Sequence, residues 1–204
     1  MLHARLDLIT ADRRALEGCI SYIESQTRPA VEAQPGSLGM SLLASPERGA
    51  AVLESFWASL HALEASEQAA ASLRGELARR AGGPLTAGQY RILVFEREAP
   101  LRGGEAVRLT RIEVRPSAVA DVIEAFGDSA VPELAETPGF RNALLFADPS
   151  SGHLISETIW RDPQARAASP SVAAVIRADL LNAAKCRIRP VEDYRLVFSS
   201  VRKP

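Results

Sequence analysis

A stretch of 23 residues that occurs twice in the chain decides its fold. The first copy reads PGSLGMSLLASPERGAAVLESFW over residues 35–57, and the second reads PGFRNALLFADPSSGHLISETIW over residues 138–160. Both copies start with Pro-Gly, carry a proline midway and end on Glu-x-x-Trp. Alternating apolar residues on either side of a Pro- and Gly-containing loop predict two strands joined by a hairpin. The two tryptophans of the chain, Trp57 and Trp160, fall on equivalent positions.

The similarity extends beyond this stretch. When the sequence is shifted by 103 residues, 25 of the 91 positions from 5 to 95 are identical without a gap. Such a long period is typical of a duplicated domain rather than of a solenoid. We therefore predict two copies of one domain, residues 1–97 and 106–204. Residues 98–105 are rich in Pro, Gly and charges and are predicted to be a linker.

Each copy is predicted to follow the order strand, helix, two strands, helix, strand. Asp12 in copy one and Pro116-Ser117 in copy two begin the first helix. A proline near the end of that helix, Pro29 or Pro132, is expected to end or kink it and to start a last short turn. The second helix is expected over 60–80 in copy one, and in copy two over 172–184 after breaks at Pro163 and Pro170. The strands are expected at 4–9, 38–44, 51–57 and 90–95, and at 107–114, 141–147, 154–160 and 194–198.

This order is that of the ferredoxin-like fold, in which helices cover one face of a four-stranded sheet. The other face of each sheet needs a partner, and the second copy on the same chain is the obvious one. The predicted fold class is therefore α+β, with two tandem ferredoxin-like domains forming an intrachain dimeric α/β barrel. The two copies are expected to form a pseudo-dimer within one chain, and several chains could still associate into a larger oligomer.

Composition excludes several classes of protein. The 204 residues include 24 basic and 25 acidic side chains, for a formal charge of −1. A chain without a basic excess is not expected to bind nucleic acid. The apolar runs are short, so no membrane segment or secretory signal is expected. Two cysteines cannot form a disulfide framework, which favours the cytoplasm. Scattered histidines and cysteines give no metal-ligand spacing, and no nucleotide-binding motif is present.

The chain resembles the dimeric α/β-barrel proteins of the antibiotic biosynthesis monooxygenase type. The resemblance rests on Pro35-Gly36 and Pro138-Gly139, on the Pro-containing hairpins, and on the two motifs Glu54-Ser55-Phe56-Trp57 and Glu157-Thr158-Ile159-Trp160. It covers nearly the whole chain, in two copies. It implies a pocket between sheet and helices that the tryptophan after the third strand often lines. Oxygenase members act on phenolic polyketides without metal, flavin or haem, because the deprotonated substrate supplies the electrons.

Seven residues are candidates for this site. Trp57 and Trp160 are expected either to bind a substrate or to anchor the core. Arg5 and Arg108 could bind an anionic substrate, or pair with Glu54 and Glu157 across the sheet. The candidates for catalysis are His61, Tyr22 and Asp7.

Each catalytic candidate has a structural alternative. Tyr22 could lie at the edge of the core, and His61 in solvent at a helix start. Their counterparts are Ala125 and Gln164, so a single pocket is expected in copy one. The resemblance also allows a haem-degrading protein, but Glu67 and Pro170 stand where such relatives carry a histidine. Asp7 and Thr110 stand near the position of an asparagine in those relatives.

The sequence leaves two functions open. The leading hypothesis is a cytoplasmic monooxygenase-like protein that needs no cofactor and acts on a small aromatic or polyketide-like molecule. The alternative is a non-catalytic protein that binds a small molecule or a partner, in which duplication only stabilises the barrel.

Overall fold

The computed structural model describes residues 1–148, 150–169 and 187–202. Contacts divide the chain into two compact units. Unit 1 comprises residues 1–90 and 196–204, and unit 2 comprises residues 91–195. Two strands, β4 (Leu85–Arg97) and β9 (Glu192–Ser199), therefore run from one unit into the other. The division into copies 1–97 and 106–204 with a linker at 98–105 rests on the duplicated sequence and stays a prediction.

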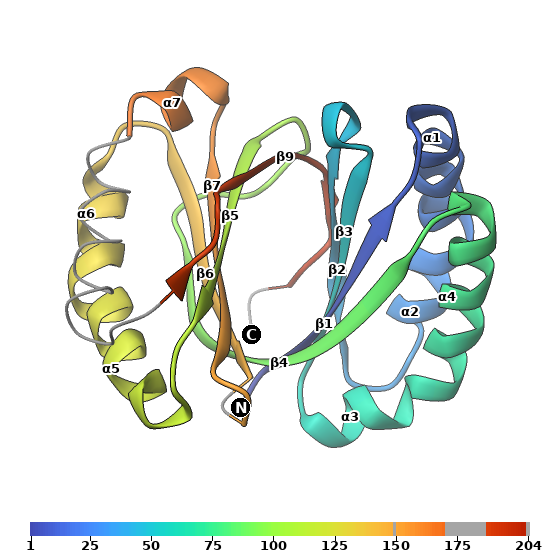
Figure 1. The fold of residues 1–204 in the computed structure, drawn as a ribbon, viewed down its shortest axis with the longest axis horizontal. Coiled ribbons are helices and arrows are strands. Elements are labelled where there is room, and N and C mark those ends of the chain that lie inside the picture. Colours follow the sequence, from blue (N-terminus) through green and yellow to red (C-terminus); the bar gives the residue numbers. More distant parts are fainter. Residues whose placement is uncertain (149, 170–186, 203–204) are drawn as a thin grey trace. The chain divides into compact units, whose positions relative to one another are not determined.

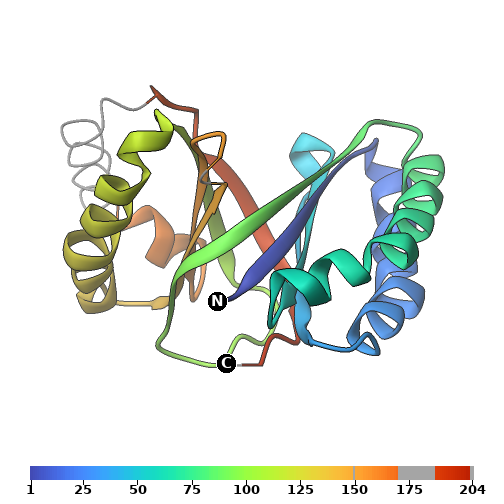
Figure 2. The ribbon, with the colours of Figure 1, turned by 90° about the horizontal axis from the view of Figure 1, so that it is seen from below.

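Unit 1 has helices on one face of an antiparallel group of strands (Figure 1, Figure 2). The remaining elements are β1 (His3–Thr10), α1 (Arg13–Tyr22), a π-helical turn (Ile23–Thr27), α2 (Arg28–Glu32), β2 (Ser37–Ser45), a 3-10 turn (Pro46–Arg48), β3 (Ala50–Trp57), α3 (Leu60–Ala65) and α4 (Glu67–Ala81). Neighbouring strands follow the order β4-β1-β3-β2-β9. The four predicted strands of copy one and its two helical regions are present, and the last strand is longer than expected.

The first helix shows why the sequence folds this way locally. The Asp12 side chain accepts a hydrogen bond from the Ala15 amide at 2.8 Å, as expected of a helix cap. Pro29, which has no amide hydrogen to donate, follows the π-helical turn and lies in the first turn of α2. Pro29 thus starts a short last turn, as predicted. Ile23 and Thr27 of the π-helical turn and Val31 of α2 are all buried.

The strand register of unit 1 decides which side chains face the helices. In the β1–β3 pair, Arg5 lies opposite Ser55 and Asp7 opposite Leu53. Because side chains alternate between the faces of a sheet, these four share one face. Leu53 belongs to the core between sheet and helices, together with Leu16, Cys19, Trp57, Leu63 and Leu77. Arg5 and Asp7 are therefore charged residues on a core-facing side of the sheet.

Unit 2 repeats the element order of unit 1 as far as the structure describes it. Its elements are β5 (Ala106–Glu113), a 3-10 turn (Pro116–Ala118), α5 (Val119–Glu124), a π-helical turn (Ala125–Ala130), α6 (Val131–Glu136), β6 (Phe140–Asp148), β7 (His153–Trp160), α7 (Pro163–Ala167) and β8 (Arg187–Ile188). Pro163 does not break a helix, because it is the first residue of α7, which Asp162 caps. Pro170 and the helix predicted over 172–184 lie outside the described residues.

The strand pairings of the two units form one cyclic order. Neighbours follow the order β7-β6-β4-β1-β3-β2-β9-β5, and a further pairing joins β5 to β7. β4 contributes its residues from Arg91 onward to the pairing with β6. β9 pairs with β5 through residues up to Arg195, and the chain that follows it bonds to β2, with Ser200 N–H donating to the Met40 carbonyl at 2.8 Å. This connectivity is that of a closed eight-stranded antiparallel barrel in an α+β protein.

Candidate functional site

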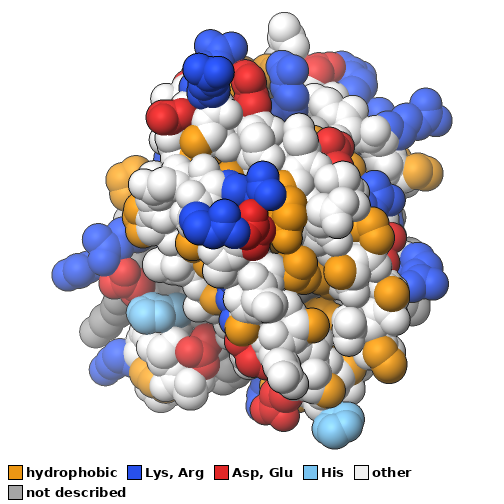
Figure 3. All heavy atoms as spheres, turned by 90° about the vertical axis from the view of Figure 1, so that its right-hand side faces the viewer, with side chains coloured by type: hydrophobic (Ala, Val, Ile, Leu, Met, Phe, Trp, Pro, Cys, Tyr) orange, Lys and Arg blue, Asp and Glu red, His pale blue; other side chains and the backbone are white. Residues whose placement is uncertain are grey.

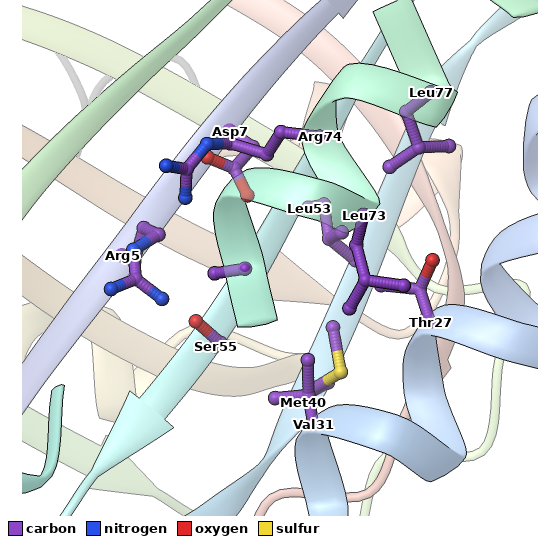
Figure 4. A pocket seen from close by; sticks show the side chains of 11 residues that line it. Arg5, Asp7, Thr27, Val31, Met40, Leu53, Ser55, Leu73, Arg74 and Leu77 are labelled. Atoms are coloured by element: carbon purple, nitrogen blue, oxygen red, sulfur yellow. The ribbon is translucent and has the colours of Figure 1, made fainter. Parts of the chain in front are cut away.

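A small cavity lies between the sheet and the helices of unit 1 (Figure 4). Its volume is about 20 Å³, which is room for one or two water-sized groups. One part of the lining is apolar, and the other part is polar and charged. The apolar residues are Val31, Met40, Leu53, Ala70, Leu73 and Leu77, and the polar ones are Arg5, Asp7, Thr27, Ser55 and Arg74. β1, β2, β3, α2, α4 and the first π-helical turn all contribute.

Asp7 is the acidic group of this cavity. Only 6% of the residue is exposed, and among the described residues its Oδ1 has no hydrogen-bond partner. Burial raises the pKa of the Asp7 carboxyl to about 6, and the positive charges of Arg74 and Arg5 oppose that increase. A carboxyl with this pKa changes its charge close to neutral pH, which suits a group that accepts and returns a proton.

Two arginines share one carboxylate beside Asp7. Arg5 donates from Nη2 to Glu67 Oε2 at 2.8 Å, and Arg74 donates from Nη2 to the other oxygen of the same carboxylate. Glu67 is half-exposed, whereas Arg5 is 2% exposed. Burial lowers the pKa of the Arg5 guanidinium, against the attraction of Glu67 and Asp7. The pKa of Glu67 is lowered despite some burial, because both arginines stabilise its charged form.

Arg5 is also fixed to the backbone of the helical region. It donates to the Leu63 carbonyl at 2.9 Å and to Ser66 Oγ at 3.1 Å, and its guanidinium carbon lies 6.0 Å from the centroid of the Trp57 ring. The predicted pairing of Arg5 with Glu54 is wrong. The register places Glu54 opposite Leu6, so Glu54 belongs to the other face of the sheet.

Both tryptophans are fully buried, and neither is among the residues that line the cavity. Trp57 Nε1 donates to Ser55 Oγ at 3.0 Å, and Ser55 in turn lines the cavity. In unit 2, Trp160 Nε1 donates to Thr158 Oγ1 at 3.2 Å, and the Trp160 ring meets Phe140 edge to face. A large side chain with all of its surface removed from water is a packing anchor. The substrate-binding role proposed for the tryptophans stays a prediction.

The other candidates lie away from the cavity. His61 is exposed on α3, and it is not part of the lining. Tyr22 is half-buried at the end of α1, packs against the core of unit 1, and has the Arg80 guanidinium carbon 4.5 Å from its ring centroid. Arg108 in unit 2 lies opposite Thr158 in the β5–β7 register and donates to the Arg166 carbonyl at 3.2 Å. Of the seven candidates, the cavity brings together Arg5 and Asp7.

Thr27 and Arg74 were missed in the sequence, although a signal was present. Thr27 falls on the buried stripe of the first helix, four residues after Ile23 and four before Val31. Arg74 falls on the buried stripe of α4, between Ala70 and Leu77. A single polar residue on an otherwise apolar helix stripe is the pattern that marks a polar group in a core.

The charged cluster is distinct from the ion pairs on the surface of the helices. On the outside of α1 and α4, Arg79 and Arg80 pair with Glu76, and Arg13 lies 3.9 Å from Glu17. The face of unit 1 in Figure 3 accordingly shows basic and acidic side chains intermixed. Exposed pairs of this kind contribute little to stability. A charged group inside the core, such as Asp7, instead carries a desolvation cost that a purely structural position would avoid.

The described residues contain no group of three or more His, Cys, Asp and Glu side chains that could hold a metal ion. They also contain no helix with the length and apolar character needed to cross a membrane. Within the part of the chain that the structure describes, the chemistry available at the cavity is therefore that of a carboxyl, two guanidiniums and two hydroxyls.

Comparison with known proteins identifies the fold of the chain but not its activity. No family model matches the chain. Two uncharacterized proteins of Mycobacterium tuberculosis, Rv2558 and Rv2557, are 25% and 24% identical over the whole chain, which covers 87% and 91% of their lengths.

Solved structures with the same fold are less similar in sequence. An anthrone oxidase-like protein has a TM-score of 0.71 at 17% identity, over 98% of this chain and 93% of that one. A provisionally assigned monooxygenase of Fusobacterium nucleatum has a TM-score of 0.74 at 11% identity, over 98% and 94%. A ferredoxin-fold protein of Listeria monocytogenes related to antibiotic biosynthesis monooxygenases has a TM-score of 0.56 at 12% identity, over 96% and 95%. The chain thus has the fold of monooxygenase-like proteins.

Proposed function

We propose that this chain is a cofactor-independent, monooxygenase-like protein that acts on a small aromatic molecule. We further propose that it arose by duplication of a ferredoxin-like domain, whose copies form one intrachain barrel. The observation that carries the functional proposal is Asp7, a buried carboxyl that faces a cavity between sheet and helices. The fold alone would not suffice, because one fold hosts many activities.

The cavity supplies the groups that such a reaction needs. Asp7 removes a proton from the substrate, and the neighbouring Arg74 stabilises the anion that forms. The carbanion then reduces dioxygen, which is the co-reactant. For anthrone, a CH₂ group and O₂ give a C=O group and H₂O, so that one oxygen atom enters the product and the other leaves as water. The carbanion and O₂ form a peroxide, and Asp7 returns the first proton to its outer oxygen. Asp7 then removes the second C–H proton as the O–O bond breaks and passes it to the hydroxide that leaves, which becomes water.

A ring-sized substrate requires the cavity to widen. A volume of about 20 Å³ holds one or two water-sized groups, so side chains in the lining must move to admit an aromatic ring. Met40 and Leu73 are suited to this movement, because Met40 is unbranched and Leu73 is only half-buried. We therefore expect substrate binding to change the packing around these two residues.

Oxygen uptake with anthrone tests the proposal. Purified full-length chain should consume dioxygen and form anthraquinone, and Asp7→Asn should reduce the rate about 100-fold or more, since a general base typically contributes that much. Thr110→Asn changes the equivalent position of unit 2 and is the matched control, with an unchanged rate. Uptake that is equal in the Asp7→Asn variant would exclude Asp7 as the base. Absence of uptake with anthrone and with other phenols would refute the oxygenase proposal.

The same small volume favours a second function, a binding protein without catalysis. In this case the cavity holds a small polar ligand, and the fully buried tryptophans only stabilise the units. A thermal-shift screen with phenols, quinones and small anions distinguishes the two functions. A ligand that raises the melting temperature but gives no oxygen uptake supports the binding protein.

A further inference from the structure

Three buried polar atoms from three elements at the cavity have no hydrogen-bond partner among the residues that the structure describes. They are Oδ1 of Asp7 on β1, Oγ1 of Thr27 in the first π-helical turn, and Nη1 of Arg74 on α4. Asp7 is 6% exposed and Thr27 is 2% exposed. A buried polar atom without a partner is unfavourable, so three around one cavity point to an occupant that pairs with them. Figure 4 shows the three side chains around the same cavity.

The charges around the cavity balance only when Asp7 is ionised. Arg5 and Arg74 carry two positive charges, and Glu67 and ionised Asp7 carry two negative charges. The remaining residues of the lining, from β2, β3, the first π-helical turn, α2 and α4, are uncharged. When Asp7 takes up a proton, the cluster gains a net charge of +1, in a region where an uncompensated charge is unfavourable.

Protonation also changes the hydrogen bonds that the three atoms can make. Ionised Asp7 can only accept, while the Thr27 hydroxyl and the Arg74 guanidinium can donate. Protonated Asp7 can donate as well, so that the lining of the cavity then offers three donors. Three donors and a charge of +1 suit one oxyanion with a single negative charge.

We propose that this cavity binds a small monovalent oxyanion of the size of formate, together with one proton that Asp7 takes up. The proposal does not rest on the oxygenase activity, because it concerns binding alone. The same planar group could be a free anion or the carboxylate of a larger ligand, and probe size distinguishes these sources. The donors are Thr27, Arg74 and protonated Asp7, while Arg5 and Glu67 hold Arg74 in place through the shared carboxylate.

The proposal predicts the direction of the pH dependence. Anion binding requires protonated Asp7, so the affinity rises as the pH falls and levels off below the pKa of Asp7, about 6. The charged groups that act on Asp7 are Arg74, Arg5 and Glu67. Above pH 6 the dissociation constant should therefore increase about tenfold per pH unit, because one proton binds with each anion.

Calorimetric titration of the full chain with formate between pH 5 and 8 tests the proposal. Formate should bind at pH 5.5 and weaken about 10-fold between pH 6.5 and 7.5. Acetate and benzoate extend the series of probe sizes. Binding of formate without benzoate indicates a free small anion, and binding of both indicates the carboxylate of a larger ligand. Absence of formate binding at pH 5.5 would overturn the proposal, and a water molecule would then be the simplest occupant.

Two variants separate this site from a general effect of charge. Asp7→Asn should bind formate with an affinity that is constant from pH 5 to 8, because the amide donates without taking up a proton. Thr27→Val removes one donor at equal shape and should weaken binding about 5- to 10-fold. Glu64→Gln, on the exposed side of α3, is the control and should leave binding unchanged. Circular dichroism verifies folding, and pH dependence that persists in Asp7→Asn would refute the role of Asp7.

Discussion

Units 1 and 2 repeat the contacts that hold a sheet to its helices. In unit 1, Arg5 and Ser66 both donate to the Leu63 carbonyl. In unit 2, Arg108 and Ser169 both donate to the Arg166 carbonyl, at the equivalent positions. The tryptophan after the third strand likewise donates to the hydroxyl two residues earlier in both units. Arg5 and Ser55 also line the cavity, but because both units make these contacts, the contacts belong to the scaffold.

The units differ at two polar residues that face the cavity. Asp7 has Thr110 as its counterpart, and Thr27 has Ala130. The acid and the unpaired hydroxyl therefore occur at these positions in unit 1 and not at the equivalent positions of unit 2. Since the scaffold contacts are the same in both units, the difference shows which residues stability does not require. Asp7 is the clearest of them, because its burial is unfavourable for folding.

Removing the tryptophans tests the similarity between the two units and should give the largest effect on the free energy of unfolding. Both rings are fully buried, so Trp57→Ala and Trp160→Ala should each lower the free energy of unfolding by about 3–5 kcal/mol. The structure gives no reason for a smaller loss at Trp57, since the cavity does not reach it. Urea denaturation followed by circular dichroism measures both losses. A loss near 1 kcal/mol at one position alone would show that the two anchors are not equivalent.

Replacing Asp7 tests the difference between the units. The folded-state pKa of about 6 exceeds the ordinary value of 3.8, so Asp7 contributes stability that is full below pH 3.8 and is lost as the pH rises through 6. Relative to the wild type, the free energy of unfolding of Asp7→Asn should therefore increase by about 2–2.5 kcal/mol between pH 4 and pH 7. Denaturation at both pH values measures the change. Thr110→Asn should show no such trend, and a trend equal in both variants would contradict the assignment to Asp7.

A smaller effect is expected from the hydroxyls that pair with the tryptophans. Ser55→Ala and Thr158→Val each leave a buried indole N–H without its acceptor, which should cost about 1–2 kcal/mol. The two losses should agree, as the contact is the same in both units. A markedly smaller loss for Ser55→Ala would mean that water in the cavity replaces the lost acceptor.

The smallest effect is expected at His61. It is exposed on α3, and its counterpart Gln164 is exposed on α7, so His61→Gln reproduces the residue of unit 2. The free energy of unfolding should change by less than about 0.5 kcal/mol, and oxygen uptake and formate binding should remain unchanged. A 10-fold loss of oxygen uptake in this variant would restore His61 as a candidate for catalysis.

The scaffold could be predicted well from the sequence, because turns and strands depend mainly on residues that are close together in the chain. Pro35-Gly36 shows the reason: Gly36 has a φ of 78°, and a Cβ there would lie 2.6 Å from Cβ of Ala62. Gly139 makes the same approach to Ala165 in unit 2, at 2.5 Å. Because the same Pro-Gly turn occurs in both copies, each copy supports the turn predicted in the other.

The cavity could be predicted only in part. Arg5 and Asp7 were candidates, but their neighbours Thr27 and Arg74 come from helices far along the chain. Arg74 is also matched by an arginine in the second copy, Arg177, so the duplication makes it look like part of the scaffold. The distance between such groups depends on how the helices pack on the sheet, and residue spacing does not determine that packing.

The strand that completes unit 1 comes from the end of the chain. Phe198 belongs to the core of unit 1, and the amides of Ser200 and Arg202 donate to the carbonyls of Met40 and Leu38. During synthesis residues 196–202 leave the ribosome after residues 1–90, so the edge of β2 stays uncovered until they appear. An N-terminal fragment that ends in the predicted linker would keep this edge open and could pair with other chains. The segment that covers β2 therefore also protects the first half of the chain against aggregation.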